Sequence, residues 1–133
     1  MRTWLAIAVS LVLITATASG GEEAATKQDR QGPVTVSVTL LEASATGIKA
    51  RVVFDTHSGS LDGIALEKAM RLRGPSGADI APTAVDQVTG GGHHRQAVVV
   101  FPAAPGATEV RMLVTNVGGI AERVFRWSLP LAR

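Results

Sequence analysis

An alternation of apolar and polar residues is the feature that most restricts the fold of this chain. From Val34 to Leu40 every second residue is valine or leucine, and threonine or serine stands between them. A period of two residues is typical of a β-strand that buries one face. Segments with this kind of pattern are Val34–Leu40, Ile48–Phe54, Met70–Arg73, Val110–Val114 and Phe125–Leu129. An all-β fold is therefore predicted.

Two further segments, Val85–Val88 and Gln96–Phe101, have strand-forming compositions and bring the expected number of strands to about seven. Glycine, proline and asparagine residues separate the strands at the spacing of an antiparallel sandwich. Ile64–Ala69 is short for a helix and predicts a loop or one helical turn. The sequence thus predicts an immunoglobulin-like antiparallel β-sandwich. Its expected core anchors are the aromatic residues Phe54, Phe101, Phe125 and Trp127.

The N-terminal residues have the composition of an export signal. Arg2 supplies a positive charge, Trp4–Ile14 is nearly continuous in apolar residues, and small residues at positions 16–18 fit a cleavage site. An uncleaved membrane anchor is the alternative, but the apolar run is shorter than the roughly 20 residues that cross a bilayer. We therefore expect a signal peptide over residues 1–18 and a mature protein in the periplasm or outside the cell.

The rest of the chain divides into a tether and a domain. Residues 19–32 are small, polar and charged, and they predict a flexible tether that cannot bury a core. The β-sandwich domain is expected over residues 33–133. The chain has 13 basic and 11 acidic side chains, and Arg2 would leave with the leader, so the mature protein is close to neutral. The charges are scattered along the strands, which predicts neither a nucleic-acid partner nor, after cleavage of the signal, a membrane partner.

The chain contains no cysteine. Many small exported domains depend on disulfides, so this domain must be held together by core packing. The composition also excludes a thiol nucleophile, a zinc finger, an iron–sulfur cluster and a blue-copper centre, all of which need a thiolate.

Histidine is scarce, and its positions define the candidate site. His57 follows the strand that ends at Phe54, and His93 and His94 precede the strand at Gln96. If these strands are antiparallel neighbours, the end of one lies beside the start of the other. All three imidazoles would then meet at one end of the sandwich, where they would suit zinc or copper(II). The predicted metal ligands are His57, His93 and His94, with Asp55 and Asp62 as orienting groups or a fourth ligand.

The backbone offers an alternative to this metal site. Successive side chains of an extended chain point to opposite faces, so His93 and His94 can share an ion only if Gly90–Gly92 bends the chain. Otherwise one histidine hydrogen-bonds the loop that carries Asp55 and Thr56, and the other faces solvent.

Arg95 stands next to the histidine pair and leaves two interpretations open. A guanidinium among imidazoles favours an anion, such as a carboxylate or phosphate, over a cation. Alternatively, Arg95 forms an ion pair with Asp55, Asp62 or Asp86.

Catalytic motifs are not evident. Ser58 and Ser60 share a loop with Asp55 and His57, but residues so close in sequence rarely reach the geometry of a nucleophile, a base and an orienting group. The chain has no Walker loop, Rossmann fingerprint or HExxH motif. We therefore expect a protein that is not an enzyme.

Three motifs together resemble an uncharacterised group of exported bacterial β-sandwich domains. They are FDTHSGSLDG (Phe54–Gly63), GGHHRQAVVVF (Gly91–Phe101) and VGGIAERVFRW (Val117–Trp127). The resemblance implies the fold and the location, and it implies no activity.

Two functions remain to be compared. The first is binding of a metal ion or another small ligand at the histidines. The alternative is an accessory module of the cell envelope that binds another protein and no small ligand. That alternative predicts an exposed apolar patch or a long unprotected edge strand.

Overall fold

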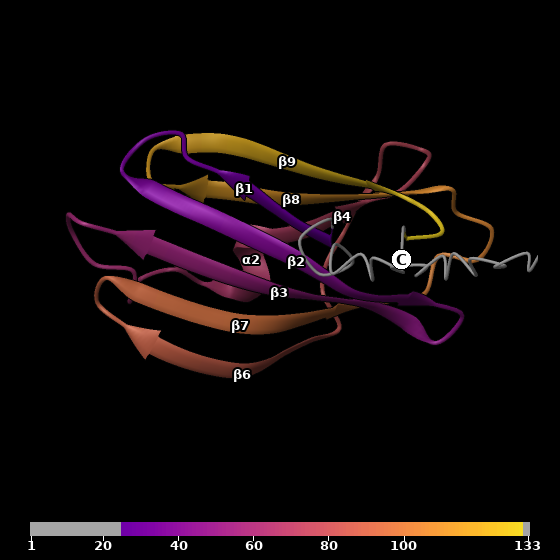
Figure 1. The fold of residues 1–133 in the computed structure, drawn as a ribbon, viewed down its shortest axis with the longest axis horizontal. Coiled ribbons are helices and arrows are strands. Elements are labelled where there is room, and N and C mark those ends of the chain that lie inside the picture. Colours follow the sequence, from indigo (N-terminus) through magenta and orange to yellow (C-terminus); the bar gives the residue numbers. More distant parts are fainter. Residues whose placement is uncertain (1–24, 132–133) are drawn as a thin grey trace, which may run out of the picture.

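The structure is a computed structural model that describes residues 25–131. These residues form two antiparallel β-sheets that pack face to face (Figure 1). One sheet has the strand order β1-β2-β3-β7-β6, and the other has the order β5-β4-β8-β9. The predicted all-β sandwich is confirmed, with nine strands in the described range where the sequence predicts about seven. The predicted signal peptide lies outside the described residues.

The elements of each layer have the following bounds. The five-stranded sheet contains β1 (Thr26–Asp29), β2 (Val34–Ser44), β3 (Gly47–Thr56), β6 (Ala84–Gly91) and β7 (His94–Phe101). The four-stranded sheet contains β4 (Met70–Arg73), β5 (Asp79–Ile80), β8 (Glu109–Val117) and β9 (Ile120–Ser128). A single helical turn, α2 (Leu66–Ala69), lies between β3 and β4. Across residues 25–131, no helix has the length and apolar character that crossing a bilayer requires.

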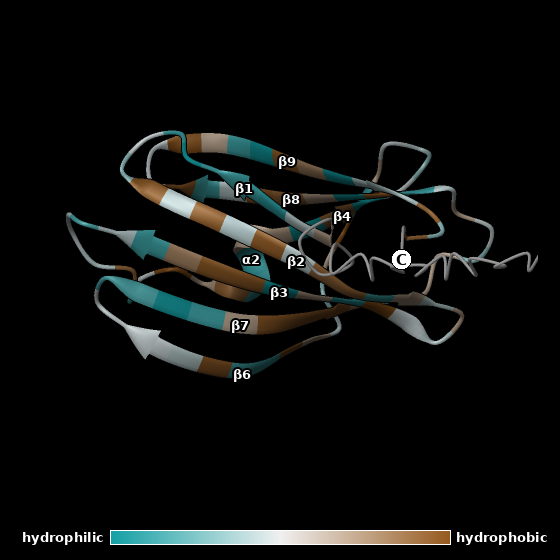
Figure 2. Ribbon diagram, viewed as in Figure 1, coloured by the Kyte–Doolittle hydropathy of each residue, from teal (hydrophilic) through white to brown (hydrophobic). Residues whose placement is uncertain are grey.

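The alternating residues of β2 divide between the core and the outer face. Val36 and Val38 are fully buried, while Thr35 and Ser37 remain partly accessible. The same alternation is visible as bands along β2 in Figure 2. Burial of apolar surface is the main favourable term in folding, so this pattern accounts for the two-layer form. The four predicted core anchors are all buried, namely Phe54, Phe101, Phe125 and Trp127.

The segment before Val34 differs from the predicted tether. Thr26–Asp29 pairs antiparallel with β2, in the register Thr26 opposite Thr39. At its start, the indole Nε1 of Trp127 donates a hydrogen bond of 2.8 Å to the carbonyl of Ala25. An edge strand needs no apolar face of its own when its backbone pairs with a neighbour and polar contacts hold it. The predicted tether over residues 19–32 is therefore corrected for residues 26–29, which belong to the sandwich.

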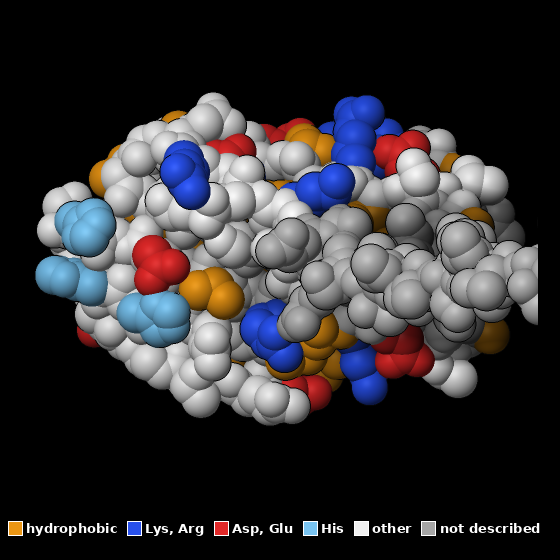
Figure 3. All heavy atoms as spheres, in the orientation of Figure 1, with side chains coloured by type: hydrophobic (Ala, Val, Ile, Leu, Met, Phe, Trp, Pro, Cys, Tyr) orange, Lys and Arg blue, Asp and Glu red, His pale blue; other side chains and the backbone are white. Residues whose placement is uncertain are grey.

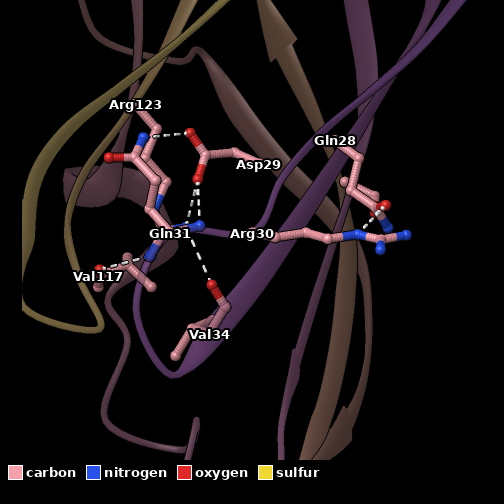
Figure 4. Close-up of polar contacts among 8 residues, drawn as sticks. Gln28, Asp29, Arg30, Gln31, Val34, Val117 and Arg123 are labelled. Carbon is pink, nitrogen blue, oxygen red and sulfur yellow. Dashed lines mark hydrogen bonds and ion pairs between the residues drawn. The ribbon is translucent and has the colours of Figure 1, made fainter.

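A buried arginine holds β1 against β9. The side chain of Arg123 is fully buried, and its Nη1 donates to Asp29 Oδ1 at 2.9 Å and to the carbonyl of Val34 at 2.9 Å (Figure 4). Its Nη2 donates to the carbonyl of Val117 at 3.0 Å. These contacts, with the Trp127–Ala25 bond, define what we call the β1–β9 seam. The seam closes one side of the sandwich between the two sheets.

The charge state of Asp29 follows from this environment. Burial by itself would raise the pKa of the carboxyl group, but two hydrogen bonds from Gln31 and the charge of Arg123 outweigh it. The pKa of Asp29 is therefore lowered. An ionised Asp29 gives the buried guanidinium the counter-charge that it needs.

Candidate functional site

The candidate residues gather at one end of the sandwich. β3 and β7 are antiparallel neighbours, and their register places Asp55 directly opposite His94. The predicted meeting of the two loops is therefore confirmed. The chain has three histidines, and Figure 3 shows all three on this end, around a carboxylate. We call this set, His57, His93, His94, Asp55 and Asp62, the imidazole rim.

Asp55 and His94 form the best-defined contact of the imidazole rim. The Nδ1 atom of His94 lies 2.5 Å from Asp55 Oδ1. Their side chains are 57% and 52% exposed, respectively. A carboxylate only accepts hydrogen bonds, so Nδ1 of His94 is the donor, and in the neutral imidazole Nε2 is the nitrogen with the free lone pair. The pair thus presents an oriented imidazole nitrogen at the surface of the molecule.

Backbone hydrogen bonds hold the two loops together beneath the imidazoles. The amide of Thr56 donates to the carbonyl of His93 at 2.9 Å, and the amide of Leu61 donates to the carbonyl of Gly92 at 2.7 Å. In return, the amide of Gly92 donates to Asp62 Oδ1 at 2.9 Å. The loop after β3 and the turn between β6 and β7 therefore form one frame.

Asp62 holds the two loops together and does not contact an imidazole. The hydrogen bond from the Gly92 amide is the main cause that lowers the pKa of Asp62, followed by Ser60 and the charge of Arg95. One of its two oxygens is already used by the backbone. Of the two predicted aspartates, only Asp55 contacts an imidazole of the rim.

The glycines before the histidines allow the β6–β7 hairpin to form and to pack closely against the loop that carries Asp62. Gly90 has a φ of 80°, and a Cβ at this position would collide with the carbonyl oxygen of His94. A Cβ on Gly91 would lie 2.9 Å from Asp62 Oδ1. His93 therefore sits in a two-residue turn, while His94 begins the strand. The bend that the glycines provide is a hairpin turn. The contact of His94 with Asp55, beside an exposed His93, agrees with the alternative in which one histidine hydrogen-bonds the strand end that carries Asp55 and Thr56.

Within the described part of the chain, Arg95 does not form the ion pair with an aspartate that the sequence suggests as one of two interpretations. It lies opposite Phe54 in the register of β3 and β7, on the side that faces the core. Its Nη1 donates to the carbonyl of Leu61 at 3.0 Å and to the carbonyl of Ile64 at 2.7 Å. Within residues 25–131 it forms no ion pair. The predicted pairing of Arg95 with an aspartate is corrected: the guanidinium anchors the loop by its carbonyls.

The imidazole rim does not present a complete set of metal ligands as it stands. Over the described part of the chain, no three side chains of histidine, aspartate or glutamate are placed to hold one ion. The donor types suit zinc or copper(II), and the histidine side chains are exposed. A metal would therefore bind first to the oriented imidazole, and further ligands would have to rotate toward it.

The described residues form an all-β sandwich. At one end of it, the exposed imidazole of His94 is oriented by the carboxylate of Asp55. Comparison with known proteins adds no relative: no family model, no curated protein and no solved structure matches this chain.

Proposed function

We propose that this is an exported, non-enzymatic protein that binds a transition-metal ion, zinc or copper(II), at the imidazole rim. The observation that carries the proposal is the hydrogen bond between Asp55 Oδ1 and His94 Nδ1. Histidines that bind metals usually donate their second ring nitrogen to a carboxylate, which fixes the tautomer and raises the basicity of the other nitrogen. In this arrangement Nε2 of His94 is the first ligand.

His57 and His93 supply the remaining nitrogen ligands in this proposal. Both lie in the two loops that the backbone hydrogen bonds join, and both side chains are exposed. Rotation of exposed side chains is cheap compared with the free energy of forming metal bonds, so the frame need not move. Asp62 stays in the frame and keeps the two loops together.

The alternative, an interaction module of the envelope, is favoured by an edge strand of the larger sheet. β6 is an edge strand of eight residues, and Val88 on it is 47% exposed. However, Gln87 has a φ of 51°, and the pairing with β7 shifts register between Asp86 and Thr89. Such a bulge interrupts an edge and disfavours pairing with another chain. We therefore place the metal site first.

Metal titration tests the proposal. The purified protein is titrated with Zn²⁺ and, separately, with Cu²⁺, while thermal unfolding is followed. A metal present at about 100 times its dissociation constant should stabilise the protein by roughly 2.7 kcal/mol. The variants His94→Ala and Asp55→Asn should lose most of that gain.

Asp86→Asn is the matched control, because it removes an exposed carboxylate from the same sheet outside the imidazole rim. It should keep the full response to metal. The electron paramagnetic resonance spectrum of bound Cu²⁺ should show coupling to ring nitrogens. If neither metal changes the unfolding temperature, the metal proposal fails and the interaction module is the better account.

A further inference from the structure

The end of the sandwich opposite the imidazole rim contains two adjoining hollows. The larger, a groove of about 1220 Å³, lies between the end of β2 and the segment that follows β9. The smaller, of about 320 Å³, lies beside the β1–β9 seam. Both are lined by Ala25, Pro130 and Leu131. In Figure 1 this end carries the turn between β2 and β3, and the imidazole rim lies at the far ends of the same strands.

The larger groove has a mostly apolar lining, with Thr39, Glu42, Ser44 and Thr108 as its polar members. β2 reaches it with an irregularity, because its pairing with β3 shifts register between Leu40 and Glu42. Leu41 is the extra residue, and 42% of it is exposed. The other apolar residues that shape the groove include Leu40, Ile48, Ala104, Leu129 and Leu131. The groove therefore offers a long chain of carbon atoms a surface to bury against.

The smaller hollow adds positive charge. Lys27 and Arg126 line it together with Trp127, and its lining contains no acidic residue. Neither cation forms an ion pair in the described part of the chain. Arg126 also lies directly opposite Arg111 in the register of β8 and β9, and like charges opposite each other destabilise a sheet. An anion at this place would relieve that repulsion.

We propose that these two hollows form a binding site for a fatty acid with a chain of about twelve carbons. The carboxylate accepts hydrogen bonds from Lys27 and Arg126 in the smaller hollow. The hydrocarbon chain passes the shared apolar residues and lies in the larger groove. Charge complementarity favours this ligand over an uncharged lipid or a cationic one. The site is separate from the imidazole rim, so it does not depend on the metal proposal.

Calorimetric titration with dodecanoate tests the site. Dodecanol has the same chain without the charge, and dodecyltrimethylammonium reverses the charge. Dodecanoate should bind saturably, at one molecule per chain, and at least about tenfold more tightly than either analogue, which corresponds to roughly 1.4 kcal/mol. Among carboxylates from hexanoate to dodecanoate, affinity should rise up to about fourfold per added methylene.

Two variants distinguish specific binding of the carboxylate in the smaller hollow from nonspecific binding of amphiphiles. The double substitution Lys27→Gln with Arg126→Gln should weaken dodecanoate about tenfold or more and leave dodecanol binding unchanged. Lys68→Gln, which removes an exposed lysine on α2 outside both hollows, should bind dodecanoate as the unaltered protein does. Equal affinity for all three amphiphiles, or a Lys27/Arg126 variant that binds normally, overturns the proposal.

Two other occupants of the hollows would also be detected. If the protein sediments with vesicles of anionic phosphatidylglycerol and dodecanoate does not compete, the ligand is a membrane surface and the fatty-acid site is wrong. The segment before Ala25 contains Glu22 and Glu23. If Glu22→Gln with Glu23→Gln lowers the unfolding temperature while dodecanoate fails to bind, the chain itself fills the hollow and the proposal is overturned.

Discussion

The imidazole rim and the β1–β9 seam use similar polar groups for opposite purposes. In the seam, the guanidinium of Arg123 is fully buried and its carboxylate partner Asp29 is only 16% exposed. In the rim, the paired side chains of His94 and Asp55 are both more than half exposed. A buried charge that loses its partner is costly, whereas an exposed pair contributes little to stability. The seam is therefore structural, and the rim is free to meet a ligand.

The same contrast applies to the arginines of the two regions. Arg95 below the rim and Arg123 in the seam both donate to backbone carbonyls of a neighbouring segment. Only Arg123 has a carboxylate partner as well. Arg95 attaches the loop after β3 to the sandwich, and Arg123 attaches β1. Neither segment has a regular apolar alternation. Where the core cannot hold a segment by apolar burial, a guanidinium with several donors does so.

The largest expected effect lies in the seam, at Trp127. Trp127→Ala removes a buried ring, which is 3% exposed, and also the hydrogen bond to Ala25. It should destabilise the protein by about 3–5 kcal/mol, measured by denaturant unfolding. Val124→Ala, on the same strand but 40% exposed, is the control and should cost little. A small loss for Trp127→Ala would show that the seam does not depend on this ring.

The next effect concerns the buried ion pair. Asp29→Ala leaves the guanidinium of Arg123 without a counter-charge, and we expect a loss of about 3 kcal/mol in the free energy of unfolding. Adding Arg123→Met to that variant should recover much of the loss, because no buried charge then remains. Asp86→Ala, an exposed carboxylate, should change stability by less than about 0.5 kcal/mol. If the double variant is as unstable as Asp29→Ala alone, the cost comes from lost packing and not from charge.

Acid should weaken the seam before it alters the packing of the core. The pKa of Asp29 is lowered in the folded protein, so the unfolded chain binds more protons as the pH falls. The stabilisation from Asp29 is then complete above its unfolded pKa, near 3.8, and is lost as the pH falls through its lower folded value. The unfolding temperature should drop below about pH 4, with a shallower slope in Asp29→Ala. An equal slope in the two proteins would contradict the assignment.

The smallest effect on stability is expected at the imidazole rim. Asp55→Asn breaks an exposed pair and should cost no more than about 1 kcal/mol, measured by thermal unfolding without metal. The same substitution should nevertheless abolish most of the metal response, since a neutral amide neither fixes the tautomer of His94 nor raises the basicity of its Nε2 as the carboxylate does. A large loss of stability from Asp55→Asn would show that the imidazole rim, like the seam, is needed to hold the fold together.

Local sequence patterns predict much of the sandwich and the position of the rim. The alternation in β2 and β3 is readable because burial of one strand face acts on every second neighbour in the chain. The placement of His57, His93 and His94 at the same end of the sandwich follows from antiparallel pairing of two recognisable strands. The polar strand β1 is not predicted, because Thr26–Asp29 has no apolar alternation and its composition matches the tether expected over residues 19–32.

The roles of the polar side chains come from contacts that the local sequence does not contain. Asp29 and Arg123 are 94 positions apart, and nothing near either residue indicates that they pair. Arg95 stands beside two histidines in sequence, yet it faces the core because successive residues of a strand point to opposite faces. Alternation and turns therefore decide the strands, because burial and backbone geometry act between near neighbours. Only packing of the two sheets decides which charges are buried and which imidazoles share a surface, because those groups meet across the whole chain.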